Sequence, residues 1–225
     1  MSGRLQRMQQ IISLLREHYG DEPRQGDEKP DPFKTLIGCV LSQRTRDRNA
    51  VKAAEALFKA AERPEDVLRL GGDRLRRLIR CLGFYNQKSR YITGICEALL
   101  KEFGGRVPDK REQLLKLPGV GPKTADVVLS YAFNRPAIAV DVHVGTVAKR
   151  LGLVDDGAAP EAVKKTLEAL VPPEECRLVD RGFVRLGKEY CRSRAPRCRE
   201  CFLNSLCDYP EHGRGEGRSA RTLRA

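Results

Sequence analysis

Tryptophan is absent from the sequence, aromatic residues make up only 6%, and there are two methionines. A core with so few large rings must be aliphatic, and the 40% of hydrophobic residues suffices for a folded chain. No apolar run approaches the roughly 18 to 20 residues that cross a bilayer. The first 20 residues carry scattered charges, unlike a secretory signal peptide, so we expect an intracellular protein with no membrane partner.

Basic residues outnumber acidic ones by 42 to 30, which gives a net charge of +12 and a pI near 9.5. Such an excess favours a polyanionic partner. Residues 211–225 contain four Arg and two Glu with little to bury, so we expect a disordered basic tail there, and 20–32 has the composition of a charged linker. Without the tail the chain keeps +10, so the basic character belongs to its folded part.

Apolar residues recur at intervals of three and four through nearly every segment, which predicts an all-α fold. Asp31 and Pro32 begin one helix as a cap and a first-turn proline. Gly71 and Gly72 predict a break in the chain, and only 137–140 is a candidate for extended structure. Further helices are expected at 47–58, 73–81, 86–103, 109–117, 123–133, 142–151, 160–170 and 174–190.

A short glycine-containing motif, LPGVGPKTAD at 117–126, lies between two of these helical patterns. Gly119 and Gly121, on either side of Val120, allow a tight turn whose backbone N–H groups bind a phosphate without reading a base. A lone Gly-x-Gly is more typical of an ordinary turn between helices. The flanking helices and the positive charge favour phosphate binding here.

Lys123 follows this turn, and Asp141 comes 18 residues later in the segment IAVDVH. By spacing alone, such a pair is typical of a salt bridge or a helix cap. A lysine amine is also a nucleophile, and a carboxylate can accept or relay a proton. Both interpretations stay open at the level of spacing.

Four of the eight cysteines lie within 17 residues, with six, two and five residues between them: Cys191, Cys198, Cys201 and Cys207. Zinc is the simpler interpretation, but one close pair with two outlying cysteines favours an iron–sulfur cubane with one cysteine for each iron. Disulfides are less expected inside a cell. The loop after the first cysteine carries Arg192, Arg194 and Arg197, which form either a phosphate contact or a solvated basic surface.

Together these motifs resemble the endonuclease III branch of the helix-hairpin-helix DNA glycosylases over most of residues 5–210. VLSQRTRD at 40–47 and LGFYNQKS at 82–89 resemble the loops that face the opened duplex in that family. The resemblance implies a six-helix barrel domain at 25–135, with a helix-hairpin-helix at about 109–133. It also implies a cluster domain formed by 1–24 and 136–210, in which the four cysteines hold a [4Fe-4S] cluster.

The same resemblance implies a bifunctional DNA glycosylase and abasic-site lyase that removes oxidised pyrimidines. Lys123 would attack the sugar C1′ of an extruded nucleotide and form a Schiff base that permits β-elimination, with Asp141 as the second catalytic group. The partner would be damaged double-stranded DNA, bound by a monomer in the cytoplasm or nucleoid. The alternatives are a mismatch-directed glycosylase of the same superfamily and a noncatalytic DNA-binding module.

The residue that fills the vacated base stack is an open choice between Gln43 and Arg44. Relatives commonly carry a Gln at the position of Arg44, and a Leu where this chain has Phe84. For each of these residues the alternative is a helix-end or core role. Gly145 and Thr146 also depart from the family, which commonly has a large apolar residue and an Arg there.

Overall fold

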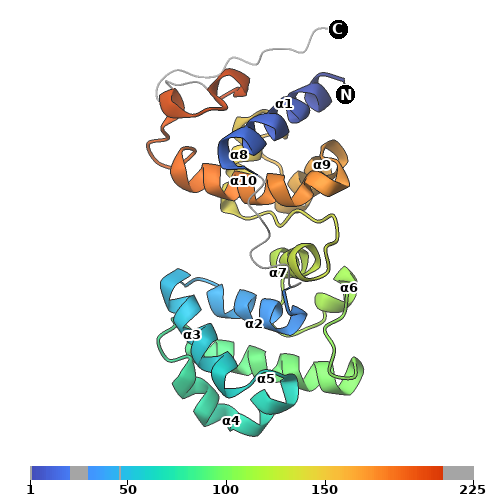
Figure 1. Ribbon diagram of the computed structural model, residues 1–225, viewed down its shortest axis with the longest axis vertical. Coiled ribbons are helices and arrows are strands. Elements are labelled where there is room, and N and C mark those ends of the chain that lie inside the picture. The colour runs from blue at the N-terminus through green and yellow to red at the C-terminus, as the bar shows by residue number, and fades with distance from the viewer. Residues whose placement is uncertain (1, 21–29, 46, 210–225) are drawn as a thin grey trace. The chain divides into compact units, whose positions relative to one another are not determined.

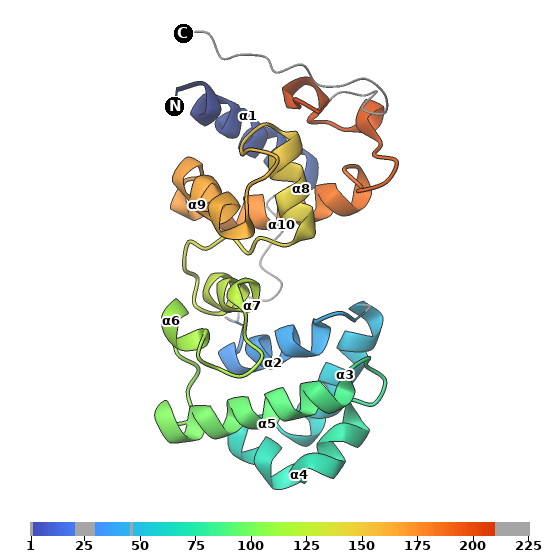
Figure 2. The same ribbon diagram turned by 180° about the vertical axis from the view of Figure 1, so that it is seen from behind.

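The computed structural model describes residues 2–20, 30–45 and 47–209 (Figures 1 and 2). The basic tail predicted at 211–225 and most of the linker predicted at 20–32 lie outside the described residues. All regular elements in the described part of the chain are helical, so the all-α prediction is confirmed. None of the described helices is long and apolar enough to cross a membrane.

The described residues form two compact units. One unit takes its residues from Glu22–Ala139 and Pro172–Arg177, and the other from Met1–Asp21, Val140–Val171 and Leu178–Ala225. The first contains α2 (Pro32–Ser42), α3 (Asp47–Ala60), α4 (Pro64–Leu78), α5 (Tyr85–Glu102), α6 (Arg111–Leu114), α7 (Pro122–Val127) and the π-helix η1 (Val128–Ala132). The second contains α1 (Ser2–Tyr19), α8 (Val142–Arg150), α9 (Pro160–Leu170) and nearly all of α10 (Cys176–Glu189).

The helix-cap signal at Asp31 is confirmed, because its side chain accepts a hydrogen bond from the Lys34 backbone N–H at 2.8 Å and Pro32 begins α2. The apolar face of α2 packs into an aliphatic core that it shares with α3, α4 and α5. The fully buried members of this core from α2 to α5 include Leu36, Ile37, Val40, Leu57, Ile92, Ile95 and Leu99.

The break predicted at Gly71 and Gly72 is confirmed as a kink, because the backbone of Gly71 is non-helical, with a φ of 72° and a ψ of 158°. Two helical segments meet at this kink to form α4. The sequence predicted the second segment, from residue 73, and missed the first, which begins at Pro64. A residue without a Cβ adopts this left-handed φ at little cost, so Gly71 lets the two segments meet at an angle.

The hairpin segment is less helical than its pattern predicts. Of 109–117 only α6 is α-helical, and 123–133 is divided between α7 and the π-helix that follows it. The segment 137–140, the candidate for extended structure, has no strand partner in the described chain. A bidentate pair joins the two sides of the hairpin, because Arg111 contacts the buried carboxylate of Asp126 at 2.8 and 3.3 Å.

The other unit has its own core. Leu15 of α1 packs against α10 at Gly182, where an added Cβ would lie 2.9 Å from Leu15 Cδ2. The buried residues of this unit include Met8, Ile11, Leu15, Val147, Leu167, Val179 and Phe183. Near the cysteine segment, Arg7 joins the Leu151 carbonyl oxygen at 3.0 Å and the Asp208 carboxylate at 2.7 Å. The ends of this unit's sequence are therefore joined by polar contacts as well as by its core.

Candidate active site

A turn with a fixed backbone connects α6 to α7. Gly119 has a φ of 71°, and an added Cβ there would lie 2.4 Å from Cδ2 of Tyr91. Val120 is buried and donates its N–H to the Leu117 carbonyl oxygen at 3.1 Å, while Gly121 precedes α7 as its N-cap. The first glycine is thus required for both its backbone conformation and its closeness to an aromatic ring.

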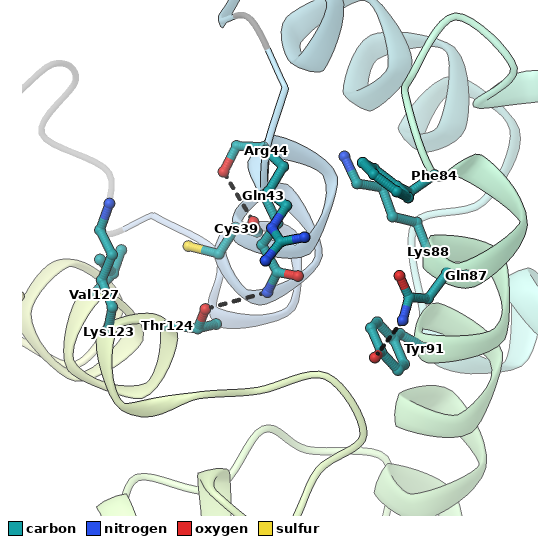
Figure 3. A pocket seen from close by; sticks show the side chains of 11 residues that line it. Cys39, Gln43, Arg44, Phe84, Gln87, Lys88, Tyr91, Lys123, Thr124 and Val127 are labelled. Atoms are coloured by element: carbon teal, nitrogen blue, oxygen red, sulfur yellow. Dashed lines mark hydrogen bonds between the residues drawn. The ribbon is translucent and has the colours of Figure 1, made fainter. Parts of the chain in front are cut away.

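A cavity of about 680 Å³ opens beside this turn (Figure 3). It is lined by Cys39, Ser42, Gln43, Arg44, Phe84, Gln87, Lys88, Tyr91, Lys123, Thr124 and Val127. These residues come from α2 and the turn after it, from α5 with its N-cap, and from α7. The structure therefore brings four sequence-predicted residues together, namely Gln43, Arg44, Phe84 and Lys123.

Lys123 lies in the first turn of α7 with an exposed side chain at the cavity (Figure 3). Cys39 of α2 also lines the cavity. Burial raises the pKa of the Cys39 thiol to about 11, and the positive charge of Lys123 opposes that rise. The thiol is consequently neutral at physiological pH.

Gln43, Arg44 and Phe84 differ in how they are held. Gln43 donates from Nε2 to the Gly119 carbonyl oxygen at 2.9 Å and lies 3.5 Å from the Thr124 hydroxyl. Arg44 and Phe84 instead have exposed side chains and positive φ angles of 51° and 58°. Non-glycine residues adopt this left-handed conformation at a cost, and such residues often gather at functional sites.

The buried ammonium of Lys88 holds the loop that contains Gln43 and Arg44. Its Nζ donates to the Leu41 carbonyl oxygen and to the Thr45 hydroxyl, each at 2.6 Å. The residue is only 3% exposed, and burial lowers the pKa of its ammonium. A single side chain thus fastens both ends of the loop.

Sequence reasoning did not assign roles to Cys39, Lys88 or Tyr91. A usable signal existed for α5, because positions 84, 87, 88 and 91 recur at the three- and four-residue spacing of one helical face. Cys39 gave no such signal, since its position opposite Lys123 depends on how α2 packs.

Asp141 and the four cysteines belong to the other unit. Asp141 is the N-cap of α8, and its Oδ1 accepts hydrogen bonds from the backbone N–H groups of His143 at 2.8 Å and Val144 at 2.9 Å. The helix-cap interpretation of this residue therefore holds, and it fixes the orientation of the carboxylate. Thr146 donates its hydroxyl to the Val142 carbonyl oxygen at 2.7 Å, and Gly145 has Val140 Cγ1 as its nearest neighbour at 3.9 Å from an added Cβ.

The four predicted cysteine ligands are half-buried thiols in one segment of the chain. Burial raises the pKa of Cys201 to about 11, with smaller upward contributions from the other three. Backbone N–H groups of Leu203 and Tyr209 lower the pKa values of Cys201 and Cys207, against the effect of burial. The described residues contain no group of three or more His, Cys, Asp or Glu side chains that is arranged to hold a metal ion. The chemistry of four shielded thiols with N–H donors nonetheless fits a thiolate-bound metal centre.

Arg150 fastens the loop that follows the first of these cysteines. Its guanidinium donates to Cys191 at both the carbonyl oxygen, 3.2 Å, and Sγ, 3.3 Å, and to the Arg192 carbonyl oxygen at 2.8 Å. Arg192, Arg194 and Arg197 are exposed, as a phosphate contact requires. Arg197 also pairs with Glu200 at 3.0 Å between Nε and Oε1.

Comparisons with known proteins agree with this arrangement. Residues 37–173 match the family model described as HhH-GPD superfamily base excision DNA repair protein. Endonuclease III of Thermotoga maritima is 42% identical over 210 residues, which cover 93% of this chain and 98% of that protein. Endonuclease III of Escherichia coli is 36% identical over 202 residues, which cover 90% and 95%.

Solved structures extend the similarity to three dimensions. A trapped covalent intermediate of endonuclease III with DNA superposes with a TM-score of 0.82 at 35% identity, covering 91% of this chain and 95% of the other. A thermostable thymine-DNA glycosylase gives a TM-score of 0.83 at 26% identity over 91% and 96%. The extent of the sequence match and of the shared fold leads to one assignment: the chain belongs to the endonuclease III family within the HhH-GPD superfamily of base excision DNA repair proteins.

Proposed function

We propose that this chain is a DNA glycosylase and abasic-site lyase that removes oxidised pyrimidines from double-stranded DNA during base excision repair. The observation that carries the proposal is the position of Lys123 on one wall of a cavity whose other walls present Arg44 and Phe84. A nucleophile beside a space lined by exposed wedge candidates is the arrangement that base extrusion requires.

The chemistry proceeds through three steps at the sugar. Neutral Lys123 Nζ forms a bond to C1′ as the glycosidic bond breaks, and the departing base takes up a proton. The amine then loses a proton, and the C1′–O4′ bond breaks with protonation of O4′, so that the opened sugar is joined to Lys123 as a Schiff base. Removal of a C2′ proton expels the 3′ phosphate, which cleaves the strand by β-elimination.

Asp141 serves this sequence through its carboxylate charge and its fixed orientation. A carboxylate stabilises the positive charge that develops at C1′, and it accepts or relays the proton that the amine must lose. The two hydrogen bonds from the start of α8 hold Oδ1 in place, so the group needs little reorganisation when charge appears.

The wedge function divides between the two sides of the cavity. Arg44 and Phe84 enter the space vacated by the extruded nucleotide, since both are exposed and project from left-handed backbone positions. Gln43 holds the loop against the hairpin turn through its hydrogen bond to Gly119. The backbone of the Gly119–Gly121 turn contacts a phosphate and positions the strand without reading its sequence.

The four cysteines hold a [4Fe-4S] cluster in this proposal. When bound, the cluster serves as a structural fastening, because neither base removal nor β-elimination transfers an electron. The chain's own contribution is to shield the thiols and to present the adjoining basic loop. Arg192 and Arg194 contact phosphate from that loop, and Arg197 does so with Glu200 orienting it.

Borohydride trapping tests the proposed function directly. The chain is incubated with duplexes that carry a thymine glycol, an abasic site, a G/T mismatch or no damage, and the Lys123→Gln variant is run beside it. A covalent complex on the thymine glycol and abasic duplexes that disappears in Lys123→Gln is the expected result. Trapping on the mismatch but not on thymine glycol would shift the substrate to a mispaired base, and trapping by Lys123→Gln at the parent level would refute the role of Lys123.

A further inference from the structure

An exposed group of cations lies next to the cavity without forming part of it. Arg48 and Lys52 occupy the first two turns of α3, and Arg77 and Arg80 occupy the end of α4 and the turn after it; we call these four residues the α3–α4 basic patch. All four side chains are exposed, and none of them forms an ion pair with another described residue.

Two contacts place the halves of the patch side by side. Asn49 donates from Nδ2 to the Cys81 carbonyl oxygen at 3.3 Å, and the Cys81 thiol lies 3.8 Å from the Asn49 carbonyl oxygen. Each contact joins a neighbour of Arg48 to a neighbour of Arg80. Figure 1 shows the two helices adjacent in the same unit.

The charge of the patch is unfavourable for the folded chain alone. Positive side chains near a helix N-terminus oppose the helix dipole, and Arg48 lies in the first turn of α3. Segments 47–52 and 77–81 together hold these four cations and one carboxylate, Asp47, a net +3. By contrast, nearby Arg76 has an internal partner in Asp73. Four cations that form no ion pair with a described residue favour an external anion.

The position of the patch identifies that anion. Arg44 is four residues before Arg48, and Phe84 is four residues after Arg80, so both cavity-lining loops continue directly into the patch. Val51, which is 56% exposed between Arg48 and Lys52, adds an apolar contact of the kind that a deoxyribose offers. A duplex whose damaged nucleotide enters the cavity brings its neighbouring phosphates to these side chains.

We propose that the α3–α4 basic patch is a second phosphate-binding surface, which holds the DNA backbone flanking the lesion and extends the interface beyond the cavity and the hairpin. The inference rests on the proposed function, because the duplex is its ligand. The patch binds and orients DNA and takes no part in bond exchange, so its contribution is to affinity and its salt dependence.

Salt-dependent binding to a duplex with a tetrahydrofuran abasic analogue tests the proposal. The variants are Arg48→Gln/Lys52→Gln, Arg77→Gln/Arg80→Gln and the quadruple combination, all at exposed positions. Lys59→Gln/Lys101→Gln is the matched control, since it removes two exposed cations of the same unit at the far ends of α3 and α5. Fluorescence anisotropy from 50 to 200 mM salt gives the slope of log K against log salt.

Each lost phosphate contact should reduce the steepness of that slope by about 0.9, so each patch double loses about 1.8 and the quadruple variant about 3.6. Over this fourfold range of salt, the parent should therefore lose about 150-fold more affinity than the quadruple variant. The control double should stay within about 0.5 of the parent. Single-turnover excision at saturating enzyme should be unchanged in the control double, because Lys59 and Lys101 lie in neither the cavity lining nor the patch.

Two results would overturn the inference. A quadruple variant with the parent's slope would show that the patch does not contact the duplex. Equal changes in the patch doubles and the control double would show only a general effect of net charge. A parent chain that neither binds the duplex nor becomes trapped on the damaged duplexes would instead refute the proposed function, so the two failures are distinguishable.

Discussion

Replacing Lys88 with Met tests whether loop fastening controls base extrusion. The change keeps the length of the side chain and removes the ammonium that bonds to Leu41 and Thr45. A hydrogen bond from a charged donor contributes about 1.5 to 3 kcal/mol, while burial of the ammonium itself costs several kcal/mol. Because the cost of burial offsets part of the gain from the two hydrogen bonds, we expect the variant to lose about 2 kcal/mol in the stability of the fastened loop conformation relative to the released one.

That loss should appear as a fall of about 30-fold in single-turnover excision of thymine glycol, since 1.4 kcal/mol corresponds to a factor of ten. Cleavage of a preformed abasic site should fall less, because no base has to be unstacked there. Thr45→Val removes one of the two acceptors and should reduce excision about fivefold. Replacement of a stacked base by 2-aminopurine next to the lesion reports extrusion directly through its fluorescence.

Cys96→Ala provides the control for stability, because Cys96 is fully buried on α5 outside the cavity. It should lower the melting temperature with excision close to that of the parent. If Lys88→Met likewise lowers the melting temperature but keeps lesion excision within about twofold of the parent, the loop-fastening role is wrong and Lys88 only supports the fold.

Substitutions at three other positions separate structure from chemistry. Gly119→Ala places a Cβ 2.4 Å from Tyr91 at a residue with a φ of 71°. We therefore expect the free energy of unfolding, measured by chemical denaturation, to decrease by about 2 kcal/mol or more, together with weaker duplex binding. A variant as stable as the parent would contradict the geometry. Asp141→Ser keeps an oxygen that caps α8, whereas Asp141→Ala loses it, so only Asp141→Ala should lower the free energy of unfolding by about 1 kcal/mol. Both variants should lose borohydride trapping if the carboxylate acts chemically. Burial raises the pKa of the Cys39 thiol from 9.0 to about 11, so the folded form binds the proton more tightly than the unfolded form, and the stability of the fold decreases between about pH 9 and 11. Cys39→Val should therefore show a smaller decrease in melting temperature over that range. A decrease equal to that of the parent would argue against this titration.

Local signals in the sequence predicted most of the helices. Asp31 with Pro32 marks the start of α2, and the pattern at 160–170 coincides with α9. Such signals act within one or two turns, so they depend little on tertiary packing. The glycine pair marks the kink inside α4, whereas the helical segment before it, which begins at Pro64, was missed.

The candidate site was predictable only where it consists of contiguous motifs. The hairpin glycines and Lys123 lie within five residues of one another and are visible in the sequence. Cys39 and Lys88 are almost 50 positions apart in the sequence, and their placement depends on the packing of α2 against α5. The hydrogen bonds of a buried lysine cannot be inferred from its spacing, because the acceptors are a main-chain carbonyl and a loop hydroxyl.

The division of one unit between both ends of the chain has a consequence for synthesis on the ribosome. Helix α1 is synthesised before the rest of its unit, but it packs on α9, and its Leu15 packs against Gly182 of α10, a helix that ends at Glu189. At translation speeds of about 5 to 20 residues per second, α1 waits roughly 10 s or longer with its apolar face uncovered. The unit at 22–139, whose sequence is nearly continuous, has all but six of its residues available well before then. The unit at 22–139 can therefore fold early, whereas α1 depends on helices that are made after that unit.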